Sequence, residues 1–214
     1  MPEHFTAPRG RHAPPLEVRL NSQRERLIAA AARVFARRGY AAASSESIAR
    51  DAGMSKATFY EHFDNREDCI VALFDAAAAT VMEAMVVAAT AAGSDPEQRM
   101  RAGVHAVLAT MAEQRDAART FLVEIVGAGE RAIARRDAIV AAFAEVLDRE
   151  NAEAARRGLA ARTPSRDDAY AVVGAIAELS SRQLRRGEPA DPRELEPVVD
   201  RLIVALMAQP PPAR

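Results

Sequence analysis

The segment 44–63, SSESIARDAGMSKATFYEHF, contains the polar residues whose types and spacing most clearly suit a chemical task. Hydroxyl, ammonium, phenol and imidazole groups gather in one short stretch, which comprises Ser55, Lys56, Ala57, Thr58, Tyr60, Glu61 and His62. Donors of these kinds contact phosphate oxygens and the edges of base pairs. Lys56 is also the only lysine of the chain. The pattern indicates recognition of DNA, although Lys56 and His62 taken singly would also suit a solvated helix surface.

Catalytic chemistry finds no support in the sequence. A carboxylate-bridged di-iron bundle needs inward Glu-x-x-His pairs, and the chain contains none. It also lacks a phosphate-cradling glycine loop and a nucleophile elbow. The single cysteine, Cys69, excludes a multi-cysteine metal site and an intramolecular disulfide. We therefore expect no catalytic residue, no metal and no cofactor, and a helical enzyme is the least favoured alternative.

A helix-turn-helix would hold the polar residues of 55–62 at a surface. Gly53 permits a left-handed turn after a first short helix, and Ser55 can cap the second helix. The apolar residues that would join these two helices are Ile48, Ala49, Ala52, Phe59 and Phe63. An earlier helix must lie beneath the pair, and it would contribute Leu27, Ile28, Ala31, Val34 and Phe35 on one face.

This segment resembles the N-terminal DNA-binding unit of the TetR family of bacterial transcriptional regulators. The matching positions are Arg24, Leu27, Ile28, Ala30, Ala31, Phe35, Gly39, Tyr40, Ser44, Ile48, Ala49, Ala52, Gly53, Met54, Ser55, Phe59, Tyr60, His62, Phe63, Arg66 and Glu67. The resemblance implies that Ser44, Tyr60 and Arg66 contact phosphates. It further implies that base or backbone readout falls mainly to Lys56, Ala57, Thr58 and His62.

Several positions depart from the family pattern. Ala43 stands where a threonine is common, so only Ser44 is left to cap the first short helix and to contact DNA there. Ser45 replaces a usual valine and Ser47 a frequent aspartate, and we expect these two serines to loosen that helix. Arg66 replaces a usual lysine, which keeps the charge and adds a fork suited to phosphate.

The distribution of proline and glycine predicts an all-α chain. No proline falls between Pro15 and Pro96, and no segment alternates strictly between apolar and polar residues. Asn65, Asp95 and Asp191 have the surroundings of helix caps. The predicted helices are 20–38, 45–52, 56–62, 66–91, 96–113, 116–126, 130–157, 166–185 and 192–208.

These helices divide into an N-terminal helix-turn-helix domain of three helices, residues 20–65, and a six-helix ligand-binding and dimerisation domain, residues 66–208. Residues 1–19 and 209–214 are rich in proline and are expected to be disordered tails.

The net charge of −1 conceals an uneven distribution of charge along the chain. Residues 1–66 carry eleven basic and seven acidic side chains, whereas residues 67–214 carry eighteen and twenty-three. The near-neutral total therefore does not argue against DNA binding by residues 1–66. Their basic excess is nevertheless too small to establish DNA binding by itself.

We expect a cytoplasmic protein that does not enter a membrane. The N-terminal residues lack the apolar core of an export signal. The longest apolar stretch, Ile70 to Ala92, contains Asp75 and Glu83 and is rich in alanine, which suits a soluble helix better than a membrane span. Cys69 at the start of this stretch suits a small buried side chain, and a redox-sensing thiol is the alternative.

A ligand pocket is expected between the fourth and the eighth helices. Large apolar residues and two polar ones fall on plausible inward faces: Phe74, Met82, Met85, His105, Leu108, Met111, Phe121, Glu124 and Phe143. His105 and Glu124 would orient a ligand within apolar surroundings. The alternative is an ordinary core, with His105 a satisfied buried histidine and Glu124 a surface residue.

The last two helices are the best candidates for an interface between two copies of the chain. Their apolar stripes contain Tyr170, Val173, Ile176, Leu184, Leu195, Val199, Leu202 and Leu206. Two such helices from each chain would form a four-helix bundle. The alternative is that these stripes pack only within one chain.

Together these features predict a homodimeric transcriptional repressor that leaves a near-palindromic DNA operator when an unknown small molecule binds. An activator or a ligand-independent regulator of the same fold is the alternative.

Overall fold

The computed structural model describes residues 15–207, and over this range the chain forms helices and no strand, which confirms the all-α prediction. The α-helices are α1 (Leu16–Ala42), α2 (Ser45–Asp51), α3 (Lys56–His62), α4 (Arg66–Ala91), α5 (Pro96–Glu113), α6 (Arg115–Leu122), α7 (Glu130–Arg156), α8 (Arg166–Arg186) and α9 (Glu196–Leu206). Two short 3-10 helices, η1 (Glu124–Gly127) and η2 (Pro192–Leu195), precede α7 and α9. The predicted tails lie outside the described residues, except for residues 15–19.

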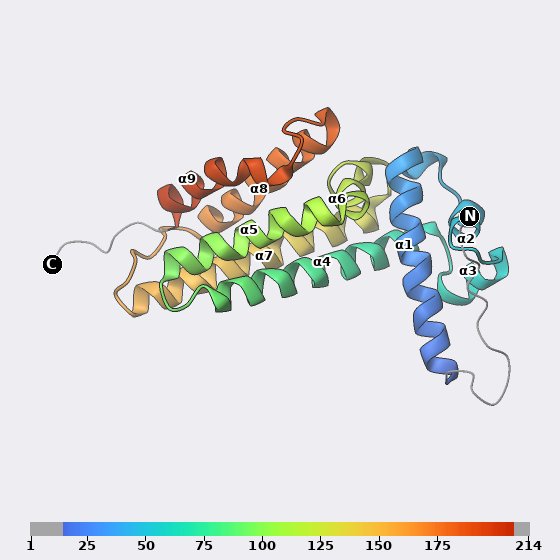
Figure 1. Cartoon of the computed structure of the whole chain (residues 1–214), viewed down its shortest axis with the longest axis horizontal. Coiled ribbons are helices and arrows are strands. Elements are labelled where there is room, and N and C mark those ends of the chain that lie inside the picture. The colour runs from blue at the N-terminus through green and yellow to red at the C-terminus, as the bar shows by residue number, and fades with distance from the viewer. Residues whose placement is uncertain (1–14, 208–214) are drawn as a thin grey trace.

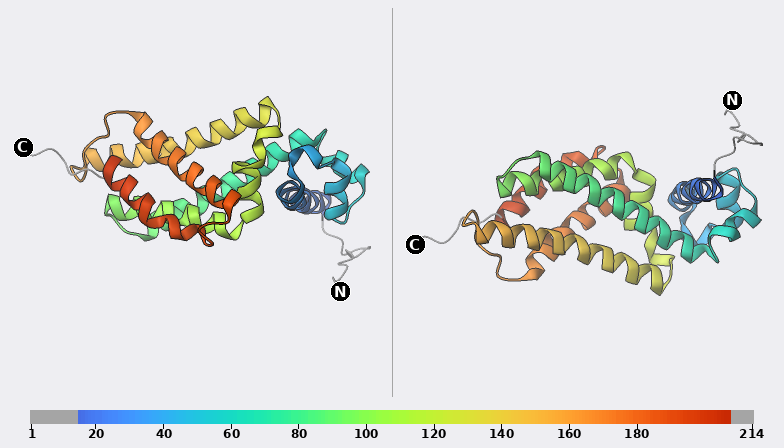
Figure 2. Two further views of the ribbon diagram at one scale, coloured as in Figure 1. Left: turned by 90° about the horizontal axis from the view of Figure 1, so that it is seen from above. Right: turned by 90° about the horizontal axis from the view of Figure 1, so that it is seen from below.

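The helices form two groups along an elongated molecule (Figure 1). Helices α1, α2 and α3 gather at one end, and α1 runs across the long axis, so that it is seen end-on in both views of Figure 2. Helices α4 to α9 make up the remainder. Among these, α4 packs mainly on α5, and α7 packs mainly on α8.

The predicted helix starts follow from side-chain caps. Asn65 accepts a hydrogen bond from the backbone N–H of Asp68 at 2.9 Å. Asp95 accepts from Glu97 at 2.9 Å, and Pro96 fills the first turn of α5. Asp191 and Glu194 form the reciprocal bonds of a capping box. These oxygens satisfy amide groups that have no partner within their own helix.

Three predicted boundaries are wrong. Helix α1 begins at Leu16, directly after Pro15, so that residues 16–19 are helical rather than part of a tail. The predicted helix 116–126 ends at Leu122 and is followed by the 3-10 turn η1. The predicted helix 192–208 divides into η2 and α9, because Pro197 has no N–H to donate and is tolerated only in the first turn of a helix.

One apolar cluster continues from the N-terminal helices into the rest of the molecule. Its buried members include Leu27, Phe35, Ile48 and Phe59 and extend to Ala117 of α6 and Ile139 of α7. A second cluster joins α5, α7, α8 and α9 around Leu108, Leu147, Val172, Val199 and Ile203. Because the first cluster spans residue 65, the division into domains 20–65 and 66–208 stays a prediction.

Cys69 is fully buried in the first cluster. Removal from water raises the pKa of its thiol to about 12, although the nearby charge of Arg24 acts in the opposite direction. A thiol in such surroundings is held in its neutral, unreactive form. The prediction of a small buried side chain is confirmed, and a redox-sensing role is not supported.

Helix α4 is long and apolar enough to span a membrane by length and composition alone. Ile70, Leu73, Phe74 and Met85 of this helix are buried against neighbouring helices, which accounts for part of its apolar character. That the chain does not enter a membrane stays a prediction.

Candidate functional site

Helices α2 and α3 are joined by a tight turn that the backbone and α1 both hold. Gly53 has a φ of 68°, which a side chain would disfavour. The N–H of Met54 donates to the carbonyl of Ala49 at 2.8 Å. Arg26 of α1 donates from Nη2 to the carbonyl of Ala52 at 2.7 Å. The predicted helix-turn-helix is therefore present and is fastened to the helix beneath it.

Serine side chains cap both short helices. Ser44 and Ser47 form a reciprocal box, in which the N–H of Ser47 donates to Oγ of Ser44 at 3.1 Å and the N–H of Ser44 donates to Oγ of Ser47 at 2.9 Å. The expectation that Ser47 loosens α2 is thus wrong, because its hydroxyl accepts the bond that an aspartate would accept. Ser55 caps α3 by accepting from the N–H of Thr58 at 3.0 Å.

The structure brings Lys56, Ala57 and Tyr60 together on the exposed side of α3. Tyr60 is 48% exposed, and Nζ of Lys56 lies 5.9 Å from the centroid of its ring. Phe59, on the opposite side, is fully buried. Ser44 and Ser55 are also exposed, at the starts of α2 and α3. This face can therefore offer an ammonium, a phenol and two hydroxyl groups to an external surface.

Two predicted contact residues of α3 are partly engaged within the protein. Thr58 is half-buried, and its hydroxyl lies 3.0 Å from that of Ser55. His62 is half-buried, and its Nε2 lies 3.3 Å from Oε1 of Gln23 on α1. Arg24, next to Gln23, donates to the carbonyl of His62 at 3.4 Å and stacks on Phe63. Sequence reasoning missed Gln23, since only tertiary packing places it beside His62.

Arg66 is also engaged within the protein. Its Nη1 donates to the carbonyl of Tyr40 at 2.9 Å and also reaches the carbonyls of Ala41 and Ala43. Its guanidinium carbon lies 4.1 Å from the centroid of the Tyr40 ring. The fork therefore binds the loop that leads to Ser44.

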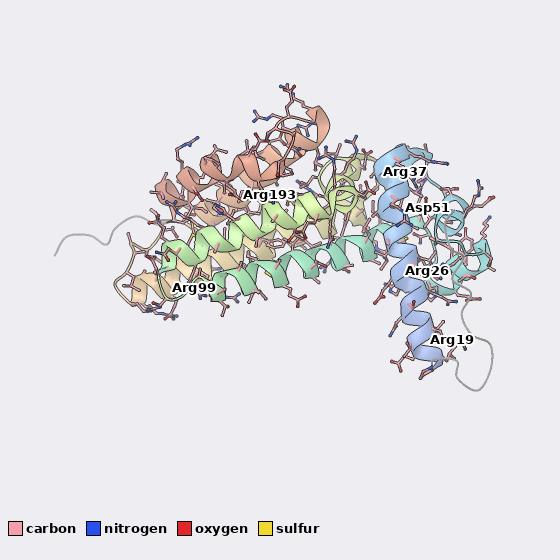
Figure 3. The ribbon with its side chains drawn as sticks, viewed as in Figure 1. Arg19, Arg26, Arg37, Asp51, Arg99 and Arg193 are labelled. Carbon is pink, nitrogen blue, oxygen red and sulfur yellow. The ribbon has the colours of Figure 1, made fainter. Side chains whose placement is uncertain are left out.

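An ion-pair cluster that sequence reasoning missed joins α1 to α2 (Figure 3). Asp51, the last residue of α2, accepts from Arg33 at 2.8 Å and also from Arg37. Burial opposes ionisation of this carboxyl, but the hydrogen bonds and the positive charges of Arg33 and Arg37 together outweigh it and lower the pKa of Asp51. The spacing of Arg33 and Arg37, one helical turn apart, was the available signal.

A cavity of about 90 Å³ lies between α4, α5, α6, α7 and α8. Four predicted pocket residues line it, namely Met85, Met111, Phe121 and Phe143. The only polar residues in its lining are Thr110 and Gln114, and no charged residue is among them. The hydroxyl of Thr110 donates to the carbonyl of Ala106 at 2.8 Å. The cavity is therefore suited to an apolar group.

The other five predicted pocket residues do not line this cavity. Phe74 packs edge-on behind Phe121, Leu108 is fully buried in the second cluster, and Met82 is not part of the lining. His105 lies 2.7 Å from Asp200 and therefore faces α9. Glu124 pairs with Arg119 at 3.2 Å. His105 and Glu124 therefore each have a charged partner away from this cavity, and their part in binding a ligand stays a prediction.

Most of the predicted interface residues are used inside one chain. Leu195 and Val199 are buried in the second cluster, and Leu202 and Leu206 are half-buried. Ile176 and Val173 line the cavity, and Leu184 packs on α6. Tyr170 alone of the eight is an exposed residue, at 47%. Whether Leu202, Leu206 and Tyr170 also meet a second copy of the chain stays a prediction.

Comparisons with known proteins agree with this geometry. Residues 27–73 match the model of the family described as bacterial regulatory proteins, tetR family. Over 86 residues, 40% of this chain, the sequence is 35% identical to the HTH-type transcriptional activator FasR of Mycolicibacterium smegmatis. The matched segments span less than two-fifths of the length of the curated relatives.

Two solved structures share the fold of nearly the whole chain. FadR from Bacillus subtilis in complex with stearoyl-CoA superposes with a TM-score of 0.76 at 20% identity, over 85% of this chain and 97% of that one. AibR in complex with isovaleryl coenzyme A and operator DNA superposes with a TM-score of 0.63 at 20% identity, over 88% of this chain and 99% of that one. At this level of identity the likeness concerns the fold.

Proposed function

The chain belongs to the tetR family of bacterial regulatory proteins, and from this membership we propose that it is a sequence-specific, DNA-binding transcriptional regulator rather than an enzyme. It acts as a repressor that a small-molecule ligand releases from a near-palindromic operator. The observation that carries this proposal is the capped, exposed face of α3 with Lys56 and Tyr60. A helix so presented can enter the major groove of DNA.

Each exposed group has a part in the proposed contact with DNA. Lys56, Ala57 and Thr58 meet base edges or the backbone, and the hydroxyls of Ser44, Ser55 and Tyr60 meet phosphates. His62 reaches the same groove from the end of α3. Arg66 acts differently from the expectation, because its bonds to the carbonyls of Tyr40 and Ala43 position Ser44. The protein works in the cytoplasm, where bacterial DNA is accessible.

The chain acts as a homodimer, since a near-palindromic operator requires two reading helices related by a two-fold axis. The outward side of α8 is the favoured interface, because Tyr170, Ala171 and Glu178 are exposed there. A side chain added at Gly174 would meet no atom within 4 Å. We place the interface on this surface rather than on the apolar stripes predicted from the sequence.

Helix α6 connects the cavity to the DNA-binding end. Ala117 and Phe121 of α6 line the cavity. Thr120, between them, donates to the carbonyl of Asp116 at 2.9 Å and lies 3.4 Å from the carbonyl of Ala32 on α1. A ligand that displaces α6 would therefore move α1. Ligand-bound molecules would favour an arrangement of the two reading helices that no longer fits the operator.

The sign of regulation has a second candidate. FasR, which is 35% identical to this chain over 86 residues, is a transcriptional activator. An activator of the same fold would bind DNA through the same face of α3. Reporter expression with and without the protein separates the two signs.

A gel-shift titration tests the proposal. The probe is the DNA upstream of the gene that encodes this chain, with unlabelled probe and random DNA as competitors, at several salt concentrations. We expect a complex that prefers the probe and weakens steeply with salt, since phosphate contacts release counterions. Absence of any sequence-preferring complex with this or other genomic fragments would refute the proposed function.

A further inference from the structure

The cavity between α4 and α8 is too small to enclose a whole ligand of drug size. Its volume is about 90 Å³, whereas such ligands usually occupy pockets of about 300–1,000 Å³. Because the lining is apolar and carries no charge, a charged group inside would lose its hydration without compensation. The cavity can therefore hold one apolar end of a ligand, and the rest must lie outside.

A larger groove adjoins the cavity on the side of the DNA-binding helices. It has a volume of about 630 Å³ and lies between α1, α4 and the junction of α5 with α6. Ala77, Gln114 and Ala117 line both the cavity and the groove. The two alanines contribute only a methyl group each to this wall. Gln114 is exposed and, within residues 15–207, its side chain makes no hydrogen bond that would fix it.

The charges that line the groove indicate which polar group of a ligand could bind there. Glu25, Glu113 and Asp116 line it, and in the part of the chain that the structure describes their carboxylates form no hydrogen bond or ion pair. Arg33 and Arg115 also line it, but the guanidinium of Arg33 is bound by Asp51. Arg193 attracts Glu113 only through space and is itself bound to Asp191. Unpaired negative charge therefore exceeds unpaired positive charge.

We propose that the regulating ligand is an amphipathic cation, with an apolar chain in the cavity and an ammonium group in the groove beside Glu25 and Asp116. This inference rests on the proposed function, because it specifies the ligand of that regulator. The acidic groove disfavours the polyanionic head of a coenzyme A thioester, so this chain would differ from FadR and AibR, whose solved structures are complexes with such ligands.

The proposed position of the ammonium group links the ligand to the DNA-binding end. The groove is lined by Glu25, Ile28 and Ala29 of α1 and also by Asp116 of α6. A cation between Glu25 and Asp116 would hold α1 and α6 in one arrangement. Ligand binding would then act on α1 directly as well as through displacement of α6.

Isothermal titration calorimetry with four octyl compounds of equal chain length tests the inference. The compounds are octylammonium, octanol, octanoate and octanoyl-CoA, each titrated into the full chain without DNA. We expect octylammonium to bind about tenfold more tightly than octanol, and octanoate and octanoyl-CoA to bind more weakly than octanol. Equal or tighter binding of either anion, or no binding of octylammonium, would overturn the inference.

Variants of this chain locate the site. The double variant Glu25→Gln with Asp116→Asn should lose about tenfold in octylammonium affinity but keep its affinity for octanol. Glu83→Gln is the matched control, because Glu83 is exposed on α4 and belongs to neither lining. Ala77→Leu enlarges a side chain that lines both the cavity and the groove and should weaken both compounds, with thermal unfolding measured to confirm the fold. Unchanged octylammonium binding by the double variant or by Ala77→Leu would refute the site.

The gel shift separates this inference from the proposed function. If the operator complex forms but an anion proves to be the releasing ligand, only the cation inference fails. If no sequence-preferring complex forms, the proposed function fails as well.

Discussion

The guanidinium of Arg66 lies 4.1 Å from the ring centroid of Tyr40 and donates to the carbonyl of the same residue at 2.9 Å. A residue at the start of α4 is thereby bound to the end of α1. The chain between Tyr40 and the cap Ser44 is fixed on both sides, because Arg66 also reaches the carbonyl of Ala43. We infer that Arg66 positions Ser44 and does not itself bind phosphate.

Substitutions of Arg66 distinguish positioning from phosphate contact. Arg66→Lys keeps the charge but loses the planar fork, so operator affinity should fall severalfold and the free energy of unfolding should fall by about 1–2 kcal/mol. Arg66→Gln should weaken binding without changing the slope of affinity against salt. If the slope falls by about one in Arg66→Gln, and Arg66→Lys restores it, Arg66 contacts a phosphate.

Lys56 and Tyr60 should contribute to affinity for DNA without supporting the fold. Lys56→Ala removes one exposed cation, so we expect weaker operator binding and a salt slope that is smaller by about one. Tyr60→Phe removes only a hydroxyl and should weaken binding at every salt concentration. Fluorescence anisotropy with labelled operator measures both, and circular dichroism monitors the fold.

Arg186→Ala is the matched control for the loss of a cation. Arg186 is exposed at the end of α8, on an element remote in sequence from α3, and within residues 15–207 it makes no ion pair. Its variant should bind the operator as the parent chain does. If Lys56→Ala behaves like this control, Lys56 is not part of the DNA-binding face.

The ion pairs of Asp51 with Arg33 and Arg37 predict how the stability of the fold depends on pH. The pKa of Asp51 is lowered in the folded chain, so its ionised form stabilises the fold above the ordinary carboxyl pKa of about 4. That contribution is lost as the pH falls towards the lowered value. At pH 7, Asp51→Asn should reduce the free energy of unfolding by about 1 kcal/mol, since Arg33 and Arg37 are partly exposed.

Urea unfolding from pH 7 to pH 2 measures this effect. The curves of the parent chain and of Asp51→Asn should converge at the acid end. Those of Asp137→Asn should follow the parent throughout, because Asp137 is 56% exposed and, among the residues that the structure describes, pairs only with its neighbour Arg136. A constant difference between Asp51→Asn and the parent at every pH would contradict the role of ionised Asp51.

The buried thiol of Cys69 should be inert in the native protein. With a pKa raised to about 12 by burial, it is almost wholly protonated at pH 8 and is shielded from reagents. A thiol-specific chromogenic reagent should therefore label it only as the chain unfolds, whereas protein in guanidinium chloride should be labelled at once. Rapid stoichiometric labelling of the native protein would instead support a redox-sensing role.

Local chemistry explains what the sequence could predict. The caps Asn65, Asp95 and Asp191 accept hydrogen bonds from backbone groups two or three residues away. The starts of three helical segments can therefore be predicted from neighbouring residues in the sequence. The turn at Gly53 and the apolar contact of Phe59 with Phe63 are equally short in range. The helix-turn-helix was therefore predictable, whereas its contacts with α1 through Gln23 and Arg33 were not.

Contacts between distant residues explain what the sequence could not predict. His105 is polar on a helix with an apolar face, and only the packing of α9 shows that its partner is Asp200 rather than a ligand. Val199 belongs to an apolar stripe that periodicity detects, but periodicity does not say whether the stripe meets the same chain or a second copy. The positions of the pocket and of the interface both depend on which helix packs against which face, and the sequence pattern does not specify this.

The revised interface gives a final prediction, in which surface and core variants should behave differently. Tyr170 is 47% exposed on α8, and a side chain at Gly174 would meet no atom of its own chain within 4 Å. Tyr170→Arg and Gly174→Arg should therefore leave the monomer folded but place a charge in the interface between two copies. We expect monomers in sedimentation equilibrium, an unchanged helical signal and weakened operator binding.

Val199→Asp is the contrasting variant, because Val199 is fully buried within one chain. A carboxylate there has no partner and should unfold the protein rather than only separate two copies. Dimers that persist in both arginine variants would exclude the outward side of α8 as the interface. A folded, monomeric Val199→Asp would instead restore the stripe on α9 as the surface by which two copies meet.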